Sequence, residues 1–305
     1  MPALLVDELS VSFSMYGRGT AKADLDAIRA LSLDVMPGEL LAVVGASGSG
    51  KSVLAHAVMG ILPKNARVGG RILYRGEPLT EKRLGALRGT EIAFIPQAVD
   101  YLDPLMRVDR QVIGTRGTRA AQEEIFARYR LAPEVGRQYP FQLSGGMARR
   151  VLFATAAVGG DVKLVVADEP TPGLGPDLCA KMMNHFRQFA DAGAGVLLIT
   201  HDVDLALGYA DRVAVFYAGV TVEIATAAEF ASGGAALRHP YSRAFADALP
   251  QNAFRPIPGR QPYAGGLGKG CPFFDRCTER RTDCASGDVP MRALRGGKVR
   301  CLHAT

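Results

Sequence analysis

Residues 45–52, GASGSGKS, have the residue types and the spacing of a loop that binds phosphate, G-x-x-x-x-G-K-[ST]. The loop follows the apolar run Leu40–Val44 and precedes a stretch with helical spacing, which is the strand–loop–helix context that such loops require. Glycines let backbone N–H groups curl around a phosphate without Cβ clashes, and the start of the helix adds partial positive charge. Lys51 would reach the β- and γ-phosphates of a nucleotide, and the Ser52 hydroxyl would ligate Mg²⁺.

A pair of carboxylates ends a second apolar run, in the segment Val162–Glu169. The run predicts a buried strand, and Asp168 at its end is suited to the coordination shell of Mg²⁺. Glu169 would point onward to the position of a hydrolytic water, as a general base. Two acids after an apolar strand are common in isolation, but here they follow a phosphate-binding loop by a whole α/β unit. This order favours a role in nucleotide hydrolysis.

A second phosphate-binding helix start is predicted at residues 143–147. Its residues are Leu143, Ser144, Gly145, Gly146 and Met147, and a helical stretch runs from Ala148 onward. The segment offers free backbone N–H groups and a hydroxyl to a phosphate. Because the chain already has one phosphate-binding loop, we expect this second site to serve the nucleotide of a neighbouring subunit.

Strands alternating with helices would position these motifs, and they indicate an α/β domain with a mainly parallel core sheet. The expected strands are Leu4–Phe13, Ala30–Val35, Leu40–Gly45, Arg71–Tyr74 with Ile92–Ile95 as one further β segment, Lys163–Ala167, Gly195–Thr200 and Arg212–Phe216. Residues 120–158 are predicted to be helical, with a loop at 143–146. No internal repeat is visible.

Length and composition, 305 residues of which 48% are hydrophobic and 22% charged, fit one large domain with a smaller appendage. No run approaches the ~18 consecutive apolar residues of a membrane-spanning helix, and the N-terminus lacks the pattern of a secretory signal. These features predict a cytoplasmic protein that works at the membrane through partners. The net charge of +6 is interleaved with acids, so we expect no nucleic-acid partner.

After residue 250 the sequence is rich in Pro and Gly and has no periodic pattern. We place a boundary near residue 238, so that residues 1–238 form the main domain and residues 239–305 a loop-rich extension. Such an extension buries too little apolar surface to fold securely alone. We expect it to need the main domain, a metal, or both.

Four of the five cysteines lie in this extension, at Cys271, Cys277, Cys284 and Cys301. In a reducing compartment, clustered thiols indicate a metal site before a disulfide framework. Four thiolates suit zinc and a [4Fe–4S] cluster about equally in softness, and free thiols are the third alternative. The fifth, Cys179, is interpreted as a small core residue in the middle of a helix.

The motifs together resemble those of ABC ATPases. The resemblance adds Gln97 in FIPQ and His201 in LLITHD to the three motifs above, in the family's order over residues 1–225. It implies a RecA-like core with an antiparallel β subdomain and a helical subdomain at about residues 98–160. It further implies that Gln97 contacts Mg²⁺ and senses a permease, and that His201 contacts the γ-phosphate and the attacking water.

The same resemblance implies the contacts of bound ATP. Phe13 matches the aromatic residue that stacks on adenine, with Tyr16 as the alternative. The residues implied in catalysis are Lys51, Glu169 and His201, those implied at Mg²⁺ are Ser52, Gln97 and Asp168, and those of the phosphate loop are Gly45, Ala46, Ser47, Gly48, Ser49, Gly50, Lys51, Ser52 and Val53.

Two further segments resemble the oligopeptide, dipeptide and nickel importer ATPases: YPFQLSGGMARRV at 139–151, and HPYSRAFADALP at 239–250 followed by CPFFDRC at 271–277. The resemblance then covers essentially the whole chain. It implies an ATP-hydrolysing subunit, peripheral on the cytoplasmic face of the plasma membrane, that energises uptake of short peptides or nickel complexes. The implied partners are a second ABC ATPase subunit in a heterodimer, two permease subunits and an extracytoplasmic substrate-binding protein. Because some members carry a [4Fe–4S] cluster in this module, the resemblance favours iron–sulfur at the four cysteines.

One departure from the family lies after the acidic pair, where Gly175 stands at the position of the D-loop Asp and Asp177 is the candidate substitute. This departure leaves open a non-hydrolysing subunit that only completes a dimer. A non-transport ABC ATPase of translation or DNA repair is a further alternative, although the chain has neither a second fused ATPase domain nor a coiled-coil insertion.

Overall fold

The computed structural model describes residues 1–16, 22–114, 117–158 and 162–305. Its larger sheet has eight strands, in the spatial order β11 (Arg292–Leu294), β12 (Gly297–Val299), β10 (Val220–Thr226), β9 (Arg212–Tyr217), β3 (Leu40–Gly45), β8 (Gly195–Ile199), β7 (Leu164–Asp168) and β6 (Ile92–Ile95). The five strands from β9 to β6 are parallel, and β10, β12 and β11 continue the sheet in antiparallel pairings.

The parallel strands arise from the continuous apolar runs of the sequence. Every residue of β3, β7 and β8 is buried, which is the pattern of strands covered by helices on both faces. One face packs on the cluster that includes Leu41 and Val43, and the other on the cluster that includes Leu40 and Val165. The predicted α/β core is therefore confirmed.

A second sheet of four antiparallel strands lies beside the core, in the order β2 (Lys22–Val35), β1 (Leu4–Tyr16), β4 (Ala66–Tyr74) and β5 (Glu77–Pro78). Helix α1 (Lys51–Met59) packs in the same apolar cluster as β1, β2 and β4. The expectation that Arg71–Tyr74 and Ile92–Ile95 form one β segment is wrong, because β4 belongs to this antiparallel sheet and β6 to the edge of the parallel one. Helix α2 (Glu81–Leu87) separates them in the chain.

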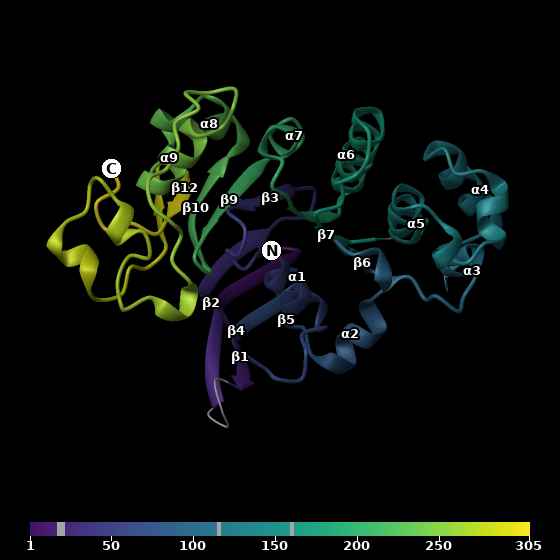
Figure 1. Cartoon of the computed structure of the whole chain (residues 1–305), viewed down its shortest axis with the longest axis horizontal. Coiled ribbons are helices and arrows are strands. Elements are labelled where there is room, and N and C mark those ends of the chain that lie inside the picture. The colour runs from purple at the N-terminus through teal and green to yellow at the C-terminus, as the bar shows by residue number, and fades with distance from the viewer. Residues whose placement is uncertain (17–21, 115–116, 159–161) are drawn as a thin grey trace.

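The remaining helices flank the core sheet or form a lobe at its β6 edge (Figure 1). They are α3 (Val108–Ile113), α4 (Arg119–Arg128), α5 (Gly145–Ala157), α6 (Pro176–Asp191), α7 (Val203–Leu207), α8 (Ala227–Ala231) and α9 (Pro240–Asp247), with 3₁₀ turns η1 (Val99–Tyr101), η2 (Pro133–Arg137), η3 (Pro140–Gln142), η4 (Gly234–Ala236), η5 (Ala264–Gly266), η6 (Phe274–Arg276) and η7 (Thr282–Ala285). Helices α3, α4 and α5 make up the lobe and share one apolar cluster with the sheet. None of the described helices combines the length and apolarity needed to cross a membrane.

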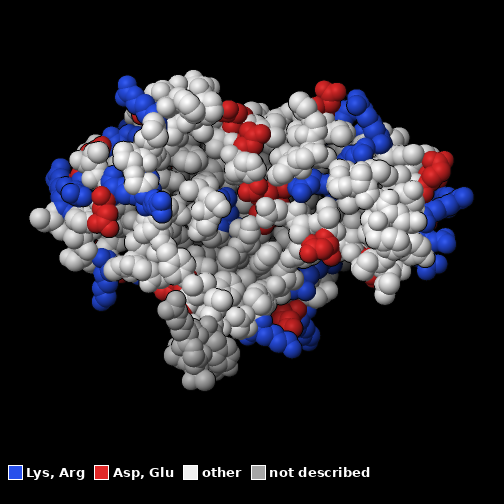
Figure 2. Space-filling model, in the orientation of Figure 1, with Lys and Arg blue, Asp and Glu red and all other residues white. Residues whose placement is uncertain are grey.

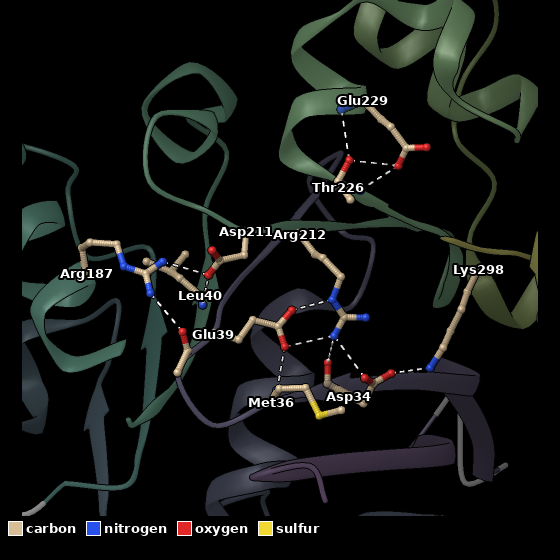
Figure 3. A network of polar contacts seen from close by, with 11 residues as sticks. Asp34, Met36, Glu39, Leu40, Arg187, Asp211, Arg212, Thr226, Glu229 and Lys298 are labelled. Carbon is tan, nitrogen blue, oxygen red and sulfur yellow. Dashed lines mark hydrogen bonds and ion pairs between the residues drawn. The ribbon is translucent and has the colours of Figure 1, made fainter. Parts of the chain in front are cut away.

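The C-terminal extension is joined to the main sheet through β12, which pairs with β10 at Glu223 and Ile224. Lys298 of β12 also forms an ion pair with Asp34 at the end of β2 (Figure 3). Asp34 accepts in addition from Arg212 Nη2 at 3.0 Å. Burial by itself would raise the pKa of Asp34, but the Lys298 and Arg212 cations hold that pKa below its ordinary value.

A buried ion pair fixes the start of the extension. The Arg238 and Glu223 side chains are both fully buried and lie 3.2 Å apart. Arg238 also donates to the carbonyls of Leu294 and Arg295 at 2.7 and 2.5 Å. The guanidinium therefore links β10 to the hairpin of β11 and β12.

Surface charge is mixed on the face that Figure 2 shows, where Lys and Arg lie in small groups separated by acidic and uncharged atoms. This distribution agrees with the interleaved charges of the sequence.

Candidate nucleotide-binding site

The predicted phosphate-binding loop lies between β3 and α1, at the carboxyl end of the central parallel strand. Gly50 caps α1 with φ of 98°, a conformation that favours glycine. A Cβ at this position would lie 2.9 Å from the Ala27 carbonyl oxygen of β2. A Cβ on Gly45 would lie only 2.4 Å from the Phe216 carbonyl oxygen of β9. A side chain at either position would clash with a backbone carbonyl of a nearby strand, β2 or β9, so both positions require glycine.

Lys51 is buried inside this loop. Its Nζ donates to the carbonyls of Gly45 at 2.9 Å and Ala46 at 3.0 Å, and the residue is only 8% exposed. Burial lowers the pKa of Lys51, and the nearby Glu169 and Asp168 carboxylates oppose that shift. The loop carbonyls thus hold the ammonium inside the curve of the loop.

Asp168 ends β7 beside the start of α1 and is 1% exposed. Burial raises its pKa, and a hydrogen bond from the Ser52 hydroxyl opposes the rise. Its Oδ1 is buried without a hydrogen-bond partner among the described residues. An unpartnered carboxylate oxygen next to a hydroxyl is the donor set that Mg²⁺ prefers, so Asp168 and Ser52 fit the predicted metal position.

Glu169 and His201 meet at the ends of β7 and β8. His201 Nδ1 lies 2.5 Å from Glu169 Oε2. Glu169 has a positive φ of 46°, and its N–H donates to the Ile199 carbonyl of β8 at 2.9 Å. Its own carbonyl accepts from Arg149 of α5 at 3.1 Å. The backbone of Glu169 is thus held by the neighbouring strand and by the helix that begins in the LSGGM segment.

An open cleft of about 480 Å³ gathers most of the predicted ATP residues. Its lining comprises Ser47, Gly48, Gly50, Lys51, Ser52, Val53, Gln97, Glu169 and His201, together with Asp26, Ala27, Tyr263 and Ala264. Four motifs that are far apart in the sequence therefore converge on one site.

Phe13, the predicted adenine-stacking residue, is absent from this lining. It is half-buried and packs against the apolar cluster between the two sheets. The side chain of its alternative, Tyr16, lies outside the described residues. The aromatic residue that does line the cleft is Tyr263 of the extension, which sequence reasoning missed because nothing near Pro262–Tyr263 links it to the loop at 45–52.

The LSGGM segment lies apart from the cleft. Ser144 caps α5, and its hydroxyl accepts from the Met147 N–H at 3.3 Å. Leu143 and Met147 pack into the lobe, whereas Ser144 and Gly145 are exposed. None of the five residues lines the cleft of the chain's own phosphate loop.

After the acidic pair, the structure differs from the sequence interpretation at Cys179. Gly175 caps α6, and Asp177 in its first turn lies 3.7 Å from Arg130 of the lobe. Cys179, expected in the middle of a helix, is the fourth residue of α6 and is only half-buried. Its thiol lies 3.6 Å from the Leu174 carbonyl, so it packs on the turn rather than in the core.

The four cysteines of the extension line one cavity of about 170 Å³. The Cys271 N–H donates to the Cys284 carbonyl at 2.9 Å, which brings two of them together. Burial raises the pKa of Cys271 to about 11, and the thiols of Cys301, Cys277 and Cys284 add to the rise. A tighter group of Asp283, Cys284 and His303, with ligand atoms within 4.8 Å of one another, borders the same cavity.

Comparison with known families assigns both parts of the chain. Residues 28–172 match the model of the ABC transporter family, and residues 222–284 match that of the oligopeptide/dipeptide transporter C-terminal region. The two matches cover the phosphate loop, the LSGGM segment and the acidic pair on one side and the first three cysteines of the extension on the other.

Individual relatives extend the match to almost the full length. A putative peptide import ATP-binding protein of Brucella melitensis is 34% identical and covers 98% of this chain and 94% of its own. The dipeptide transport ATP-binding protein DppD of Bacillus subtilis is 34% identical, with 92% of this chain and 88% of the relative covered. A bacterial ABC transporter cassette solved as a dimer has the same fold, with a TM-score of 0.63 and 22% identity over 73% of this chain and 98% of that one. The chain is an ABC ATPase and belongs to the ATP-binding subunits of the oligopeptide/dipeptide type of ABC transporter.

Proposed function

We propose that this chain hydrolyses ATP to energise the uptake of short peptides through a separate membrane permease. The observation that carries the proposal is the single cleft in which the phosphate loop, Gln97 and the Glu169–His201 pair converge. The names of the relatives, which refer to peptide import and dipeptide transport, support peptides as the cargo. Uptake of nickel complexes is the alternative that the sequence raised for the same subfamily.

The roles of the residues follow from their positions. Lys51 would neutralise charge on the β- and γ-phosphates after leaving the loop carbonyls, which is electrostatic stabilisation by a positioned cation. Glu169 would take a proton from the attacking water, and His201 would orient that carboxylate and contact the γ-phosphate. Ser52, Asp168 and Gln97 would hold Mg²⁺, which supplies positive charge to the phosphates when bound.

The active form would be a dimer. Ser144 and Gly145 are exposed and do not line the chain's own cleft, so they would be available to close over the nucleotide of a second subunit. A cleft that opens to solvent on the phosphate side leaves the γ-phosphate in contact with bulk water, and a second helix start would exclude that water. We propose a head-to-tail arrangement with a second, different ATPase subunit.

The permease would dock on the lobe of α3, α4 and α5. Tyr101, Leu105, Met106 and Phe141 expose 48%, 87%, 40% and 74% of their surface there. Two of these stretches are adjacent, because the Val108 N–H donates to the Gln138 carbonyl at 3.0 Å. Large exposed apolar side chains gathered on one surface are typical of an interaction site. Docking there would hold the protein on the cytoplasmic face of the membrane as a peripheral subunit.

The extension at 239–305 would carry a metal. Four thiols around one cavity fit a [4Fe–4S] cluster, which uses four Cys ligands. A tetrahedral zinc site needs Zn–S distances of about 2.3 Å, so its thiolates must lie close together. No three of the four thiols meet within 4.8 Å in the described part of the chain, which favours the larger cluster over a single zinc ion.

Co-purification tests the proposed function. The chain is co-expressed with candidate permease subunits and a candidate second ATPase subunit, and the complex is reconstituted into vesicles. We expect ATPase activity to rise when a binding protein loaded with a short peptide is added, and Glu169→Gln in this chain to abolish the rise. Stimulation only by a binding protein loaded with a nickel complex would show that the cargo is a nickel complex and not a peptide. Hydrolysis with no permease in the complex would contradict an importer.

The same co-purification tests the docking surface. Leu105→Ser should weaken co-purification, whereas the exposed Phe254→Ser should not.

A further inference from the structure

Part of the lining of the nucleotide cleft comes from two distant parts of the chain. Asp26 and Ala27 belong to β2, and Tyr263 and Ala264 belong to the extension. The extension is thus part of the nucleotide cleft. Apart from the imidazole of His201, Tyr263 is the one aromatic side chain among the described residues of the lining.

A continuous set of contacts holds this segment against the phosphate loop. The Gly219 N–H, in the turn between β9 and β10, donates to the Ser49 carbonyl at 3.2 Å. The Gly219 carbonyl accepts from the Arg29 N–H of β2 at 2.8 Å. The Arg29 guanidinium then donates to the carbonyls of Leu267 at 2.8 Å and Ala264 at 3.4 Å. These hydrogen bonds therefore fix the position of η5 relative to the phosphate loop.

Close packing at glycines restricts where this segment can lie. A Cβ on Gly219 would lie 2.8 Å from the Ala27 carbonyl oxygen and 3.2 Å from Cβ of Ala264. A Cβ on Gly265 would lie 2.8 Å from Cε1 of Tyr263 and 3.5 Å from the Asp26 N–H nitrogen. The ring of Tyr263 thus rests on the backbone of Gly265 beside β2, while 51% of the residue is exposed.

Tyr263 therefore has the properties of a platform for a flat ligand. One part of the ring is supported by backbone, the other part faces the cleft, and the hydroxyl need not find a buried partner. Phe13 lacks these properties, because it packs into the apolar cluster between the sheets and does not line the cleft. A nucleotide held by its phosphates at the start of α1 must place its base elsewhere along the same cleft.

We propose that Tyr263, and with it the C-terminal extension, stacks on the adenine base of ATP bound at Lys51. This inference rests on the proposed ATP site and adds the residue that recognises the base. Aromatic stacking on a nucleobase does not depend on hydrogen-bond geometry, so the contact would favour a nucleotide over bare phosphate chains. The extension would then sense whether the cleft holds nucleotide.

The absence of tryptophan from the chain gives a direct test, since a single introduced Trp is the only indole emitter. The intact protein is prepared as Tyr263→Trp, and as Phe254→Trp, an exposed aromatic site of the same extension outside the cleft lining. Both are titrated with Mg-ATP and with inorganic tripolyphosphate. We expect ATP to quench the emission of Tyr263→Trp and not that of Phe254→Trp, and tripolyphosphate to quench neither.

Affinity measurements complete the test. Tyr263→Ala should raise the Kd for ATP about tenfold and leave the Kd for tripolyphosphate unchanged, and Tyr263→Phe should restore ATP binding. Gly265→Ala, which displaces the ring without removing it, should give the same selective loss. Unchanged ATP affinity in Tyr263→Ala, or a selective loss in Phe13→Ala alone, would overturn the inference. Failure of the wild type to bind ATP, or ATP binding that does not depend on Lys51, would instead contradict the ATP site itself.

Discussion

His201 Nδ1 lies 2.5 Å from Glu169 Oε2, a short contact between the ends of two neighbouring parallel strands. The His201 side chain is 64% exposed and that of Glu169 is 15% exposed. Both side chains line the same cleft, so the imidazole faces the carboxylate and remains accessible from the cleft.

Replacement of Glu169 by Gln should separate ATP binding from hydrolysis. The amide keeps the size of the carboxylate but cannot take a proton from water, so we expect hydrolysis to fall by a factor of about 10²–10⁴. ATP should then hold the variant and its partner ATPase subunit in a stable dimer, measured by light scattering. Glu124→Gln, on the exposed face of α4, is the matched control and should leave the rate unchanged. A variant that stays monomeric with ATP and partner would contradict the head-to-tail dimer.

Lys51→Ala and His201→Ala should have different effects, because the two residues act on different parts of the nucleotide. Removal of the buried ammonium takes away the charge that offsets the β- and γ-phosphates, so ATP affinity should fall at least tenfold. Loss of the His201 ring should slow hydrolysis by about 10² while changing affinity less than threefold. Calorimetric titration and single-turnover hydrolysis measure the two quantities. Equal losses of affinity in both variants would refute this division of roles.

Protein purified without oxygen should be brown and contain about four irons per chain. Cys271→Ser should remove both the colour and the iron, because this thiol shares a cavity with the other three. Cys179→Ser is the control, since Cys179 lies in the first turn of α6 and does not line the cavity. Iron analysis and visible absorption provide the readout.

A colourless protein with one zinc ion would instead support zinc as the metal held by the four cysteines. Native protein without metal, whose four thiols all react with an alkylating reagent, would reject a shared site.

His239 should make stability depend on pH in the acidic range. Burial lowers its pKa to about 3, from 6.5 in the unfolded chain. Between these values the unfolded state binds a proton that the folded state does not, so stability falls as pH decreases, by about 1.4 kcal/mol per pH unit. His239→Asn keeps an acceptor for the Tyr241 N–H and removes the titration. Urea unfolding at several values between pH 4 and 7 should therefore show a shallower dependence for the variant; parallel profiles would contradict the prediction.

Sequence alone predicted those parts of the site that are formed by local patterns. The phosphate loop and the acidic pair follow continuous apolar runs, and such runs fix both the strand and the position of the residue after it. The cleft wall at Tyr263 depends on contacts between residues more than 200 positions apart, such as Arg29 with Leu267, and no local pattern records them. The split between Arg71–Tyr74 and Ile92–Ile95 was missed for a related reason, since two short apolar runs do not reveal which sheet each one joins.

The pairing of β12 with β10 also bears on the order in which the protein is completed during synthesis. Chains emerge from the ribosome N-terminus first, so β10 is made well before the strand that covers its edge. Until residues 294–295 follow, Arg238 has the Glu223 and Glu229 carboxylates but not its two carbonyl acceptors. Cys301, which borders the four-cysteine cavity, emerges later still. Strand β12 and the fourth thiol of the cysteine cavity are thus both added at the end of synthesis, and a ribosome that stops before Gly297 would release a protein that lacks both.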